Sequence, residues 1–255
     1  MSERVLVVGP GGREHALVRT LRRGTRAPEV LALPGNAGIE RDGVECLPYG
    51  DVVEAARERE VDLVVVGPEA PLVAGLVDDL AAAGIRAFGP TRAAARIEGS
   101  KAYAKELMRD CGVPTASHVM FRDRDEAAAH LACASYPAVL KADVLAAGKG
   151  VIIAGDEREA REALDVFFGE KRFGETTVVL EEFLEGEELS LLALCDGERA
   201  VPLAPAQDYK RIFDGDEGPN TGGMGSYSPV PGIDAAEVEL LVDLVHRPVV
   251  ELMAR

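Results

Sequence analysis

Short apolar segments alternate with amphipathic segments along the first 90 residues of the chain. Val5–Val8, Val30–Leu33 and Leu63–Val66 are apolar runs of strand length, and glycine or proline follows each of them. Apolar positions between these runs recur at helical spacing, and Asp51 and Glu54 have the spacing of a capping box ahead of one such helix. This alternation predicts a parallel sheet with helices on both faces.

One further helix is expected before the pattern changes. Pro71 suits a first helical turn, and Leu72, Leu76 and Leu80 then recur four residues apart until Gly84. We therefore predict a single helix between Pro71 and Gly84, followed by a short strand.

A different order of elements begins after about residue 90. Ser100 is a candidate cap for a helix that Gly112 ends. A helix is expected from about residue 157, and strands are expected at 116–120, 138–141, 151–154, 178–182 and 189–195. A glycine-rich irregular segment fills 205–232, and a last helix begins near residue 234 and meets Pro248, which should kink it.

Composition restricts the class of ligand. The chain has 255 residues, is 47% hydrophobic and carries a net charge of −16. Because no basic stripe is visible, nucleic acid and anionic membranes are poor partners. No apolar run approaches the roughly 18–20 residues of a membrane span, and the N-terminus lacks the features of a signal peptide. The 4 cysteines form no C-x-x-C pair and predict free thiols in a cytoplasmic protein.

A glycine-rich loop, residues 9–12, follows the first strand and opens the first helix. Main-chain amides in such a loop can point at an anion, and Arg13 can add a charge-assisted hydrogen bond. A dinucleotide fingerprint would need a third glycine where Glu14 stands and an acidic residue after the second strand, so a dehydrogenase is not predicted. A loop that binds a smaller phosphate and a tight turn without a ligand both remain.

Three later segments carry candidate chemistry. Lys141 and Lys149 flank a glycine- and alanine-rich loop between two strands, which can fold over a triphosphate or be a plain turn. It is not a P-loop, since Gly150 stands where serine or threonine is required. The acidic run 181–188 can hold a nucleoside or be a solvated turn. The segment 207–225 reads as a closing loop over a charged ligand or as a disordered insertion.

Taken in order, the motifs resemble those of one family. They are GGREHAL after the first strand, PGNAG at 34–38, GPEAPLV at 67–73, GSKAYAKELM at 99–108, KAD and LAAGKGV within 141–151, EEFLEGEELS at 181–190 and GPNTGGMGSYSP at 218–229. Together they resemble the phosphoribosylamine–glycine ligase family of the ATP-grasp superfamily along nearly the whole chain.

The resemblance implies the fold and the reaction. It implies an α/β chain with an N-terminal Rossmann-like, substrate-binding domain at 1–100. An incomplete ATP-grasp α+β domain would follow at 101–255, with a lid subdomain at about 115–188. It also implies that ATP phosphorylates glycine to glycyl phosphate, which the amine of 5-phosphoribosylamine attacks to give glycinamide ribonucleotide, ADP and phosphate. ATP and Mg²⁺ or Mn²⁺ are the expected cofactors.

Residue roles follow from the same resemblance. ATP would be held by Lys105, Lys141, Gly148, Lys149, Gly150, Glu181, Leu184 and Glu188. The phosphoribosyl substrate would lie near Gly11, Gly12, Arg13, Asn36 and Glu69. The joining centre would lie near Asp208, Lys210, Asn220, Thr221 and Gly222.

The chain departs from the family pattern at two points. Val144 stands where the family usually has glycine, which predicts weaker or slower lid closure if that position needs positive φ. A glycine at 144 that left ATP affinity and turnover unchanged would refute this prediction. The family chain is also expected to continue past Arg255 with its metal ligands and C-terminal third. The alternatives are therefore a non-catalytic ATP-binding fragment and another ATP-grasp carboxylate–amine ligase.

Overall fold

The computed structural model describes residues 3–146, 150–215, 217–221 and 223–255, without the side chains of Pro219 and Asn220. Its contacts divide the chain into two compact units, Met1–Gly99 and Ser100–Arg255. Each unit is described by itself below.

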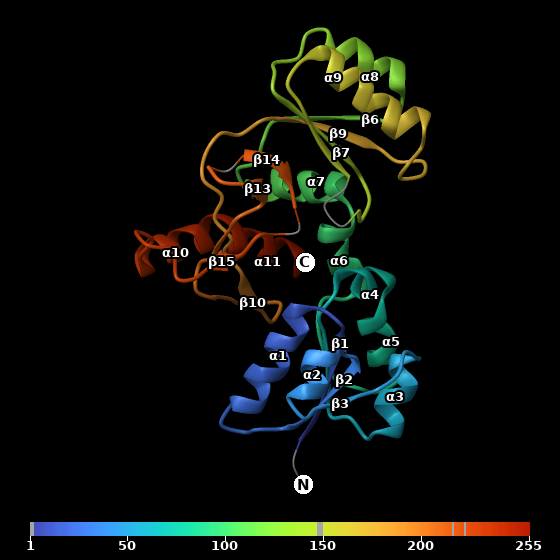
Figure 1. Ribbon diagram of the computed structural model, residues 1–255, viewed down its shortest axis with the longest axis vertical. Coiled ribbons are helices and arrows are strands. Elements are labelled where there is room, and N and C mark those ends of the chain that lie inside the picture. Colours follow the sequence, from blue (N-terminus) through green and yellow to red (C-terminus); the bar gives the residue numbers. More distant parts are fainter. Residues whose placement is uncertain (1–2, 147–149, 216, 222) are drawn as a thin grey trace. The chain divides into compact units, whose positions relative to one another are not determined.

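The first unit is built on a parallel sheet in the order β3-β2-β1-β4-β5. The strands are β1 (Arg4–Gly9), β2 (Glu29–Pro34), β3 (Glu45–Cys46), β4 (Leu63–Val66) and β5 (Ala87–Phe88). Helices cover both faces, and Figure 1 shows α1 and α3 on opposite sides of the strands. The predicted parallel sheet is confirmed.

Alternate strand residues supply the two apolar layers of this unit, because successive side chains of a strand point to opposite faces. Val5 and Val7 pack with α1 (Gly12–Arg23) and α2 (Ala37–Arg41) on one face. Leu6 and Val8 pack on the other face, with α3 (Val52–Glu58) and α5 (Leu76–Ala82). Continuous apolar strands are what burial on both faces requires.

The single helix predicted between Pro71 and Gly84 is wrong. The structure has α4 (Glu69–Ala74) and α5, separated at Gly75, whose φ is 98°. The Arg92 side chain, from α6 (Arg92–Gly99), fills the space that a Cβ at Gly75 would need, and its Nε donates to the carbonyl of Ala74 at 3.1 Å. The regular leucine spacing continues across the break, which is why periodicity alone missed it.

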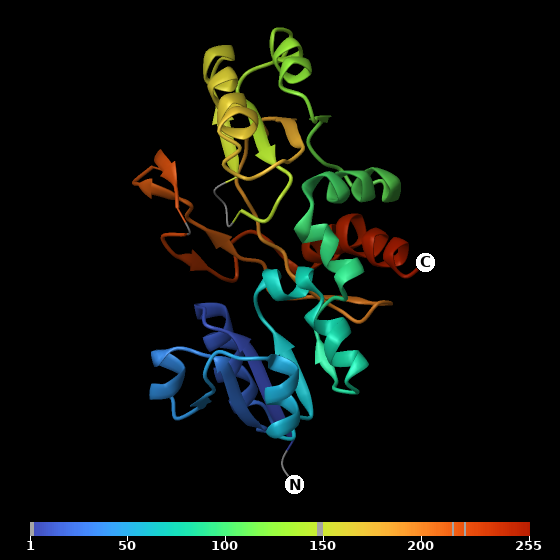
Figure 2. The ribbon, with the colours of Figure 1, turned by 90° about the vertical axis from the view of Figure 1, so that its right-hand side faces the viewer.

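The second unit begins with α7 (Lys101–Cys111), which Ser100 caps and Gly112 ends in the left-handed conformation, as predicted. An antiparallel sheet follows in the order β6-β9-β7-β8. Its strands are β6 (His118–Phe121), β7 (Ala138–Ala142), β8 (Val151–Ala154) and β9 (Val178–Glu182). Figure 2 shows α8 (Arg124–Leu131) and α9 (Glu157–Leu164), in light green and yellow, together on one side of this sheet. A short π-helical turn, η1 (Asp165–Gly169), continues α9.

The remainder of the second unit consists of short elements. The strand expected at 189–195 is only β10 (Ala193–Cys195), which pairs with β11 (Ala200–Pro202). The segment expected to be irregular contains two small pairs, β12 (Gln207–Asp208) with β15 (Ser226–Tyr227), and β13 (Arg211–Phe213) with β14 (Glu217–Asn220). The last helix consists of α10 (Ala235–Leu241), the π-helical η2 (Val242–His246) and α11 (Arg247–Met253), with Pro248 in the first turn of α11. The kink expected at Pro248 stays a prediction.

Candidate functional site

The candidate substrate residues of the first unit gather at the carboxyl edge of its parallel sheet. Gly11, Gly12 and Arg13 follow β1, Asn36 follows β2, and Glu69 follows β4. The chain order of the strands reverses between β1 and β4. Open α/β sheets bind ligands at such a switch point.

Asn36 joins the second strand's loop to the glycine loop. Its Oδ1 accepts hydrogen bonds from the amides of Gly38 at 2.8 Å and Ile39 at 3.0 Å, so it caps α2. Its Nδ2 donates to the carbonyl of Pro10 at 2.9 Å. The side chain therefore fixes the loop that carries Gly11.

Glu14 lies inside the glycine loop, where only 2% of it is exposed. Its Oε2 accepts from the amide of Gly11 at 2.7 Å, and its Oε1 lies 2.8 Å from Nε of Arg13. The side chain also packs against Gly67, where an added Cβ would overlap its carboxylate. Sequence reasoning missed this role, although Glu14 has capping-box spacing from Gly11.

Arg13 lies between two carboxylates. Its Nη2 is 3.4 Å from Oε2 of Glu69. Desolvation alone would lower the pKa of Arg13, but hydrogen bonds and charge from Glu14 and Glu69 outweigh it and raise that pKa. The pKa of Glu69 is lowered, chiefly by a hydrogen bond from its own main-chain amide and further by Arg13. This edge of the sheet therefore presents the Arg13 guanidinium, which two carboxylates hold, beside the main chain of the glycine loop.

In the second unit, Lys141 and Glu181 project from the same face of the antiparallel sheet. Alternate residues of β7 and β9, including Leu140 and Leu180, pack towards α8 and α9. Residues of the opposite parity point away from those helices. The register pairs Lys141 with Val179, so the Lys141 and Glu181 side chains are diagonal neighbours.

Lys105 of α7 completes a buried ionic cluster with these two residues. Oε2 of Glu181 lies 3.0 Å from Nζ of Lys105 and 2.9 Å from Nζ of Lys141. The side chains of Glu181 and Lys105 are only 5% and 7% exposed. A single carboxylate thus holds one buried and one partly exposed ammonium group, which leaves a net positive charge on the cluster.

Two residues that sequence reasoning missed fix this cluster. Thr115 Oγ1 accepts from Nζ of Lys105 at 2.7 Å. Asp143, two residues after Lys141, accepts from Oγ of Ser100 at 2.9 Å and from the amide of Ala102 at 3.0 Å. Asp143 therefore ties the end of β7 to the start of the helix that carries Lys105. No local sequence pattern predicts this contact, because Ser100 and Asp143 lie 43 residues apart in the chain.

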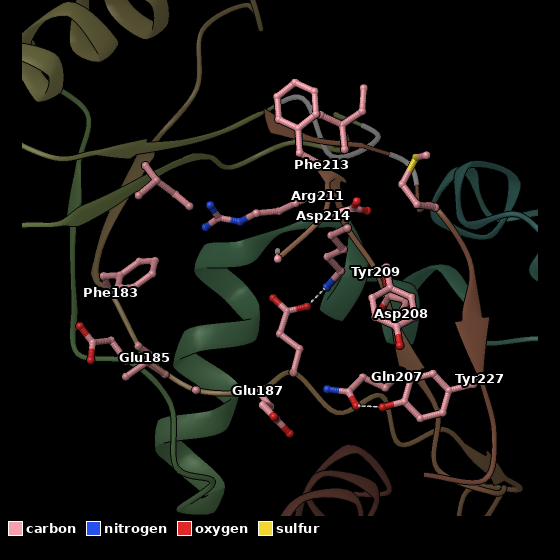
Figure 3. Close-up of a pocket in the computed structure, with 18 residues that line it drawn as sticks. Phe183, Glu185, Glu187, Gln207, Asp208, Tyr209, Arg211, Phe213, Asp214 and Tyr227 are labelled. Carbon is pink, nitrogen blue, oxygen red and sulfur yellow. Dashed lines mark hydrogen bonds and ion pairs between the residues drawn. The ribbon is translucent and has the colours of Figure 1, made fainter. Parts of the chain in front are cut away.

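A cavity of about 890 Å³ adjoins the end of β9. Phe183 and Leu184 line it directly after Glu181, together with Ile153 of β8 and Tyr209. Ile153 lies on the same sheet face as Lys141. Each of the two residues directly follows a strand residue that packs towards the helices, so its side chain points to the other face. Figure 3 shows Phe183 and Glu185 on one side of the cavity, with Asp208 and Tyr209 on the other. The volume lies in the range of small-molecule sites.

The cavity brings together residues predicted from two separate motifs. Glu188, from the acidic run, forms an ion pair with Lys210, from the later loop. This bond raises the pKa of Lys210, Asp208 adds to the rise, and desolvation opposes it. Leu184, with 64% of its surface exposed, lines the same cavity.

The later loop is held by its own hydrogen bonds. The amide and Oγ1 of Thr221 both donate to the carbonyl of Lys210, at 2.6 and 2.9 Å. The backbone of Asn220 pairs with Arg211 between β14 and β13. Gly222 lies outside the described residues. Asp208 and Lys210 line the cavity, and Thr221 is joined to Lys210 by these two hydrogen bonds.

Part of the lid prediction lies outside the described residues, namely Gly148 and Lys149. Gly150 is buried, and its carbonyl accepts from the amide of Ala142 at 2.8 Å. Val144 does not have positive φ and packs against the core of the sheet and its helices. The steric clash considered for Val144 is therefore absent, while slower lid closure stays a prediction.

Other features limit the chemistry of the described part. Within the described ranges, His, Cys, Asp and Glu side chains form no group of three or more that could hold a metal ion. Cys46, Cys111, Cys133 and Cys195 are free thiols. Among the helices that the structure describes, none is long and apolar enough to span a membrane.

Two family models together match almost the whole chain. Residues 3–98 match the N domain of phosphoribosylglycinamide synthetase, and residues 99–255 match its ATP-grasp (A) domain. The strand–helix unit and the cluster described above fall in these two parts respectively.

Individual relatives agree with the models. A phosphoribosylamine–glycine ligase of Halalkalibacterium halodurans is 45% identical over 251 residues, which are 96% of this chain and 58% of that protein. The trifunctional purine biosynthetic protein adenosine-3 of Gallus gallus is 49% identical over 242 residues, 91% of this chain and 24% of that protein. The crystal structure of a phosphoribosylamine–glycine ligase from Thermotoga maritima superposes with a TM-score of 0.84 at 37% identity, covering 97% of this chain and 60% of that one. The chain thus spans about 60% of such a ligase.

Proposed function

This chain belongs to the phosphoribosylglycinamide synthetase family, and on that premise we propose that it binds ATP and takes part in joining glycine to 5-phosphoribosylamine. The products would be glycinamide ribonucleotide, ADP and phosphate, formed through glycyl phosphate. The Halalkalibacterium and Thermotoga relatives are phosphoribosylamine–glycine ligases, which supports this reaction.

The observation that carries the proposal is the cluster of Lys105, Lys141 and Glu181. Two ammonium groups converge on one buried carboxylate oxygen, at 3.0 and 2.9 Å. The cluster carries more positive than negative charge, so its two ammonium groups can also bind an incoming phosphate group. Phosphoryl transfer depends mostly on positioning and on neutralising charge, which is what two fixed lysines supply.

The adjoining cavity suits the nucleoside. An adenine ring needs an apolar wall and main-chain hydrogen-bonding groups, which Phe183 and Leu184 can supply. Ribose hydroxyls need a carboxylate acceptor, and Glu188 lines the same cavity. Because Lys210 now pairs with Glu188, we expect this ion pair to open or rearrange when a nucleotide binds.

The phosphoribosyl substrate is assigned to the first unit. Gly12 leaves open space at the start of α1, and the helix amides there favour an anion. Arg13 adds a charge that Glu14 and Glu69 hold in place. The attacking amine would come from this substrate, with glycine held near Asp208 and Lys210.

Mg²⁺ would neutralise part of the charge on the phosphates of ATP in a reaction of this class. The described side chains bring no metal-binding group of three or more together, so no step is assigned here to a metal held by the protein. We also propose a cytoplasmic location, because the free thiols suit a reducing compartment.

Calorimetry with ATP tests the first half of the proposal. The chain should bind ATP, and Lys141→Met should weaken binding at least tenfold, while Lys171→Met, which removes an exposed lysine paired with Glu175, should not. No interaction with ATP in the folded chain would refute the proposal.

Phosphate release tests the second half. Release should require both glycine and 5-phosphoribosylamine, and release with neither would exclude this ligase activity. The second candidate is a nucleotide-binding protein without ligase activity, because the cavity and its Glu188–Lys210 pair suit nucleotide binding by themselves. ATP binding without glycine-dependent phosphate release would favour that candidate.

A further inference from the structure

The segment 115–117, between α7 and β6, carries two of the acceptors that hold Lys105. Oγ1 of Thr115 accepts from Nζ of Lys105 at 2.7 Å, and the carbonyl of Ala116 accepts from the same atom at 3.3 Å. Glu181 supplies a third acceptor, at 3.0 Å. Because a lysine ammonium has three N–H donors, each of them has a partner here. The direction in which the Lys105 ammonium points therefore depends on where this segment lies.

Glu182 holds the other end of this segment. Its Oε1 accepts from the amide of Ser117 at 2.8 Å, and its own amide donates to the carbonyl of Ser117 at 3.1 Å. Both main-chain polar groups of Ser117 are thereby fixed, directly after the residue whose carbonyl accepts from Lys105. Along this stretch of chain the lining of the cavity begins one residue later, at Phe183. The proposed nucleotide contacts therefore leave the Glu182 side chain without a role.

The side chain of Glu182 takes the place of its own main-chain carbonyl in the sheet. β6 and β9 are antiparallel and pair His118 with Glu181, so Ser117 and Glu182 are the next pair. Two residues of a hydrogen-bonded antiparallel pair normally exchange both main-chain bonds. Here the Ser117 amide donates to the carboxylate instead, while the amide of Glu182 still donates to the Ser117 carbonyl. The ladder between β6 and β9 therefore ends at a bond that depends on a side chain.

We propose that Glu182 is a positioning residue, which sets the place of the Lys105 ammonium through the segment 115–117. Without an acceptor on the side chain at 182, the Ser117 amide is expected to turn to the main-chain carbonyl of residue 182. The rest of the segment would move with it, and Lys105 would keep Glu181 but lose the geometry of its two other acceptors. The two neighbouring glutamates thus have different tasks, since Glu181 supplies the counter-charge and Glu182 fixes the direction of the ammonium group.

The expected effect on function rests on the proposed binding of ATP by Lys105 and Lys141. The side chain of Lys141 is 28% exposed and can follow a ligand, whereas that of Lys105 is 7% exposed and has little room to do so. Misplacing a positioned group by about 1 Å can cost roughly a hundredfold in rate. A shift of the segment 115–117 should therefore weaken ATP binding through Lys105.

The first experiment needs no ligand, because NMR observes the lysine ammonium groups directly and Lys105→Met identifies the Lys105 signal. Hydrogen exchange of this ammonium should be at least threefold faster in Glu182→Ala, and Glu182→Gln, which keeps an oxygen acceptor, should restore the slow exchange. Glu182→Met, which keeps the side-chain length without the acceptor, replaces the alanine variant if that variant does not fold. The control is Glu159→Ala, since Oε2 of Glu159 accepts from the amide of Gly155 at the same 2.8 Å, beside β8 at the opposite edge of the sheet. Unchanged exchange in Glu182→Ala, or fast exchange in Glu182→Gln, would overturn the proposal.

The second experiment asks whether Glu182 acts on ATP through Lys105. In calorimetry, Glu182→Ala should weaken ATP binding at least threefold, while Glu182→Gln and Glu159→Ala should leave it unchanged. In the Lys105→Met background, Glu182→Ala should have no further effect, because the group that it positions is gone. An equal loss in both backgrounds would show a general structural effect and would overturn the proposal. If the unsubstituted chain bound no ATP, the proposed function would fail, and the exchange experiment alone would decide the role of Glu182.

Discussion

Each unit has a nearly buried carboxylate among its own candidate site residues, but the two carboxylates have different partners. Glu14 is 2% exposed and accepts from the main-chain amide of Gly11 and from Arg13, which is its sequence neighbour. Glu181 is 6% exposed and faces two lysines that lie 40 or more residues away in the chain. The first site is thus organised around main chain, and the second around charge brought together by the fold.

The difference has consequences for both stability and ligand binding. At Glu14 the buried charge is satisfied locally, and the groups left for a ligand are main-chain amides and one guanidinium. At Glu181 the groups left for a ligand are the same ammonium groups that the carboxylate now holds. Substitutions should therefore disturb loop geometry in the first unit and charge balance in the second.

Removing Glu181 should produce the largest effect. Glu181→Leu leaves Lys105 and Lys141 without a counter-charge, and breaking a buried ion pair in this way costs about 3–5 kcal/mol. The measurement is urea unfolding with hydrogen exchange of the β9 amides, which reports on the second unit alone. Adding Lys105→Met to Glu181→Leu should recover part of the loss, because it removes one unpaired charge.

The control for this prediction is Glu175→Ala. Glu175 also pairs with a lysine, Lys171, but its side chain is 88% exposed. Exposed pairs of this kind contribute little to stability. Similar losses for Glu181→Leu and Glu175→Ala would contradict the idea that burial of the charge sets the size of the effect.

Glu14→Ala should have the next largest effect. The variant leaves the partly buried amide of Gly11 without its charged acceptor and removes the partner of Arg13, so the first unit should lose about 1.5–3 kcal/mol. Hydrogen exchange of the β1 amides measures this loss. Glu54→Ala is the control, since Glu54 has the same position in α3 but is exposed.

Gly67→Ala tests the position of the Glu14 side chain in a second way, because an added Cβ would overlap the Glu14 carboxylate. The two substitutions should be less than additive, since removing Glu14 makes room for the new methyl group. Full additivity would show that Glu14 and Gly67 do not act on each other.

Asp143→Ala should have a smaller effect on stability but a distinct effect on binding. Loss of its bonds to Ser100 and Ala102 should cost about 1 kcal/mol, a value similar to the loss of a helix cap. ATP affinity should also fall, because the end of β7 that carries Lys141 is no longer tied to the start of the helix that carries Lys105. Asp123→Ala removes the cap of α8 and should cost similar stability while ATP affinity stays unchanged. Equal affinity in both variants would mean that Asp143 does not position the lysines.

Features that depend on residues close together in the chain could be predicted from the sequence. Asp51 and Ser100 cap their helices as predicted, because a cap needs only a side chain and an amide three residues later. The strand Leu63–Val66 could also be predicted, because all of its residues are apolar. The break at Gly75 was missed because it depends on Arg92, which fills the turn from another helix.

Features that depend on distant contacts could not be read in this way. The bond between Asp143 and Ser100 joins residues 43 apart, and the pair of Lys210 with Glu188 joins residues 22 apart. The resemblance grouped some of these residues by role, but their contacts follow from the fold. Helix α8 was also missed, since its buried positions are mostly alanines and give weak periodicity.

The smallest expected effect concerns the charge of Glu69. Its folded-state pKa is lowered, first by its own main-chain amide and then by Arg13, so its contribution to stability is fully present above the unfolded pKa of about 4.3. That contribution is lost as the pH falls through the folded pKa. Arg13→Gln should move the pKa of Glu69 upwards without restoring its ordinary value, because the amide bond remains. Carboxyl NMR titration measures this shift, and Arg19→Gln, which removes a partner of Asp42 instead, should leave Glu69 unchanged. If Arg13→Gln also left the Glu69 titration unchanged, the guanidinium would not bridge the two carboxylates, and the glycine loop would present main chain alone to a ligand.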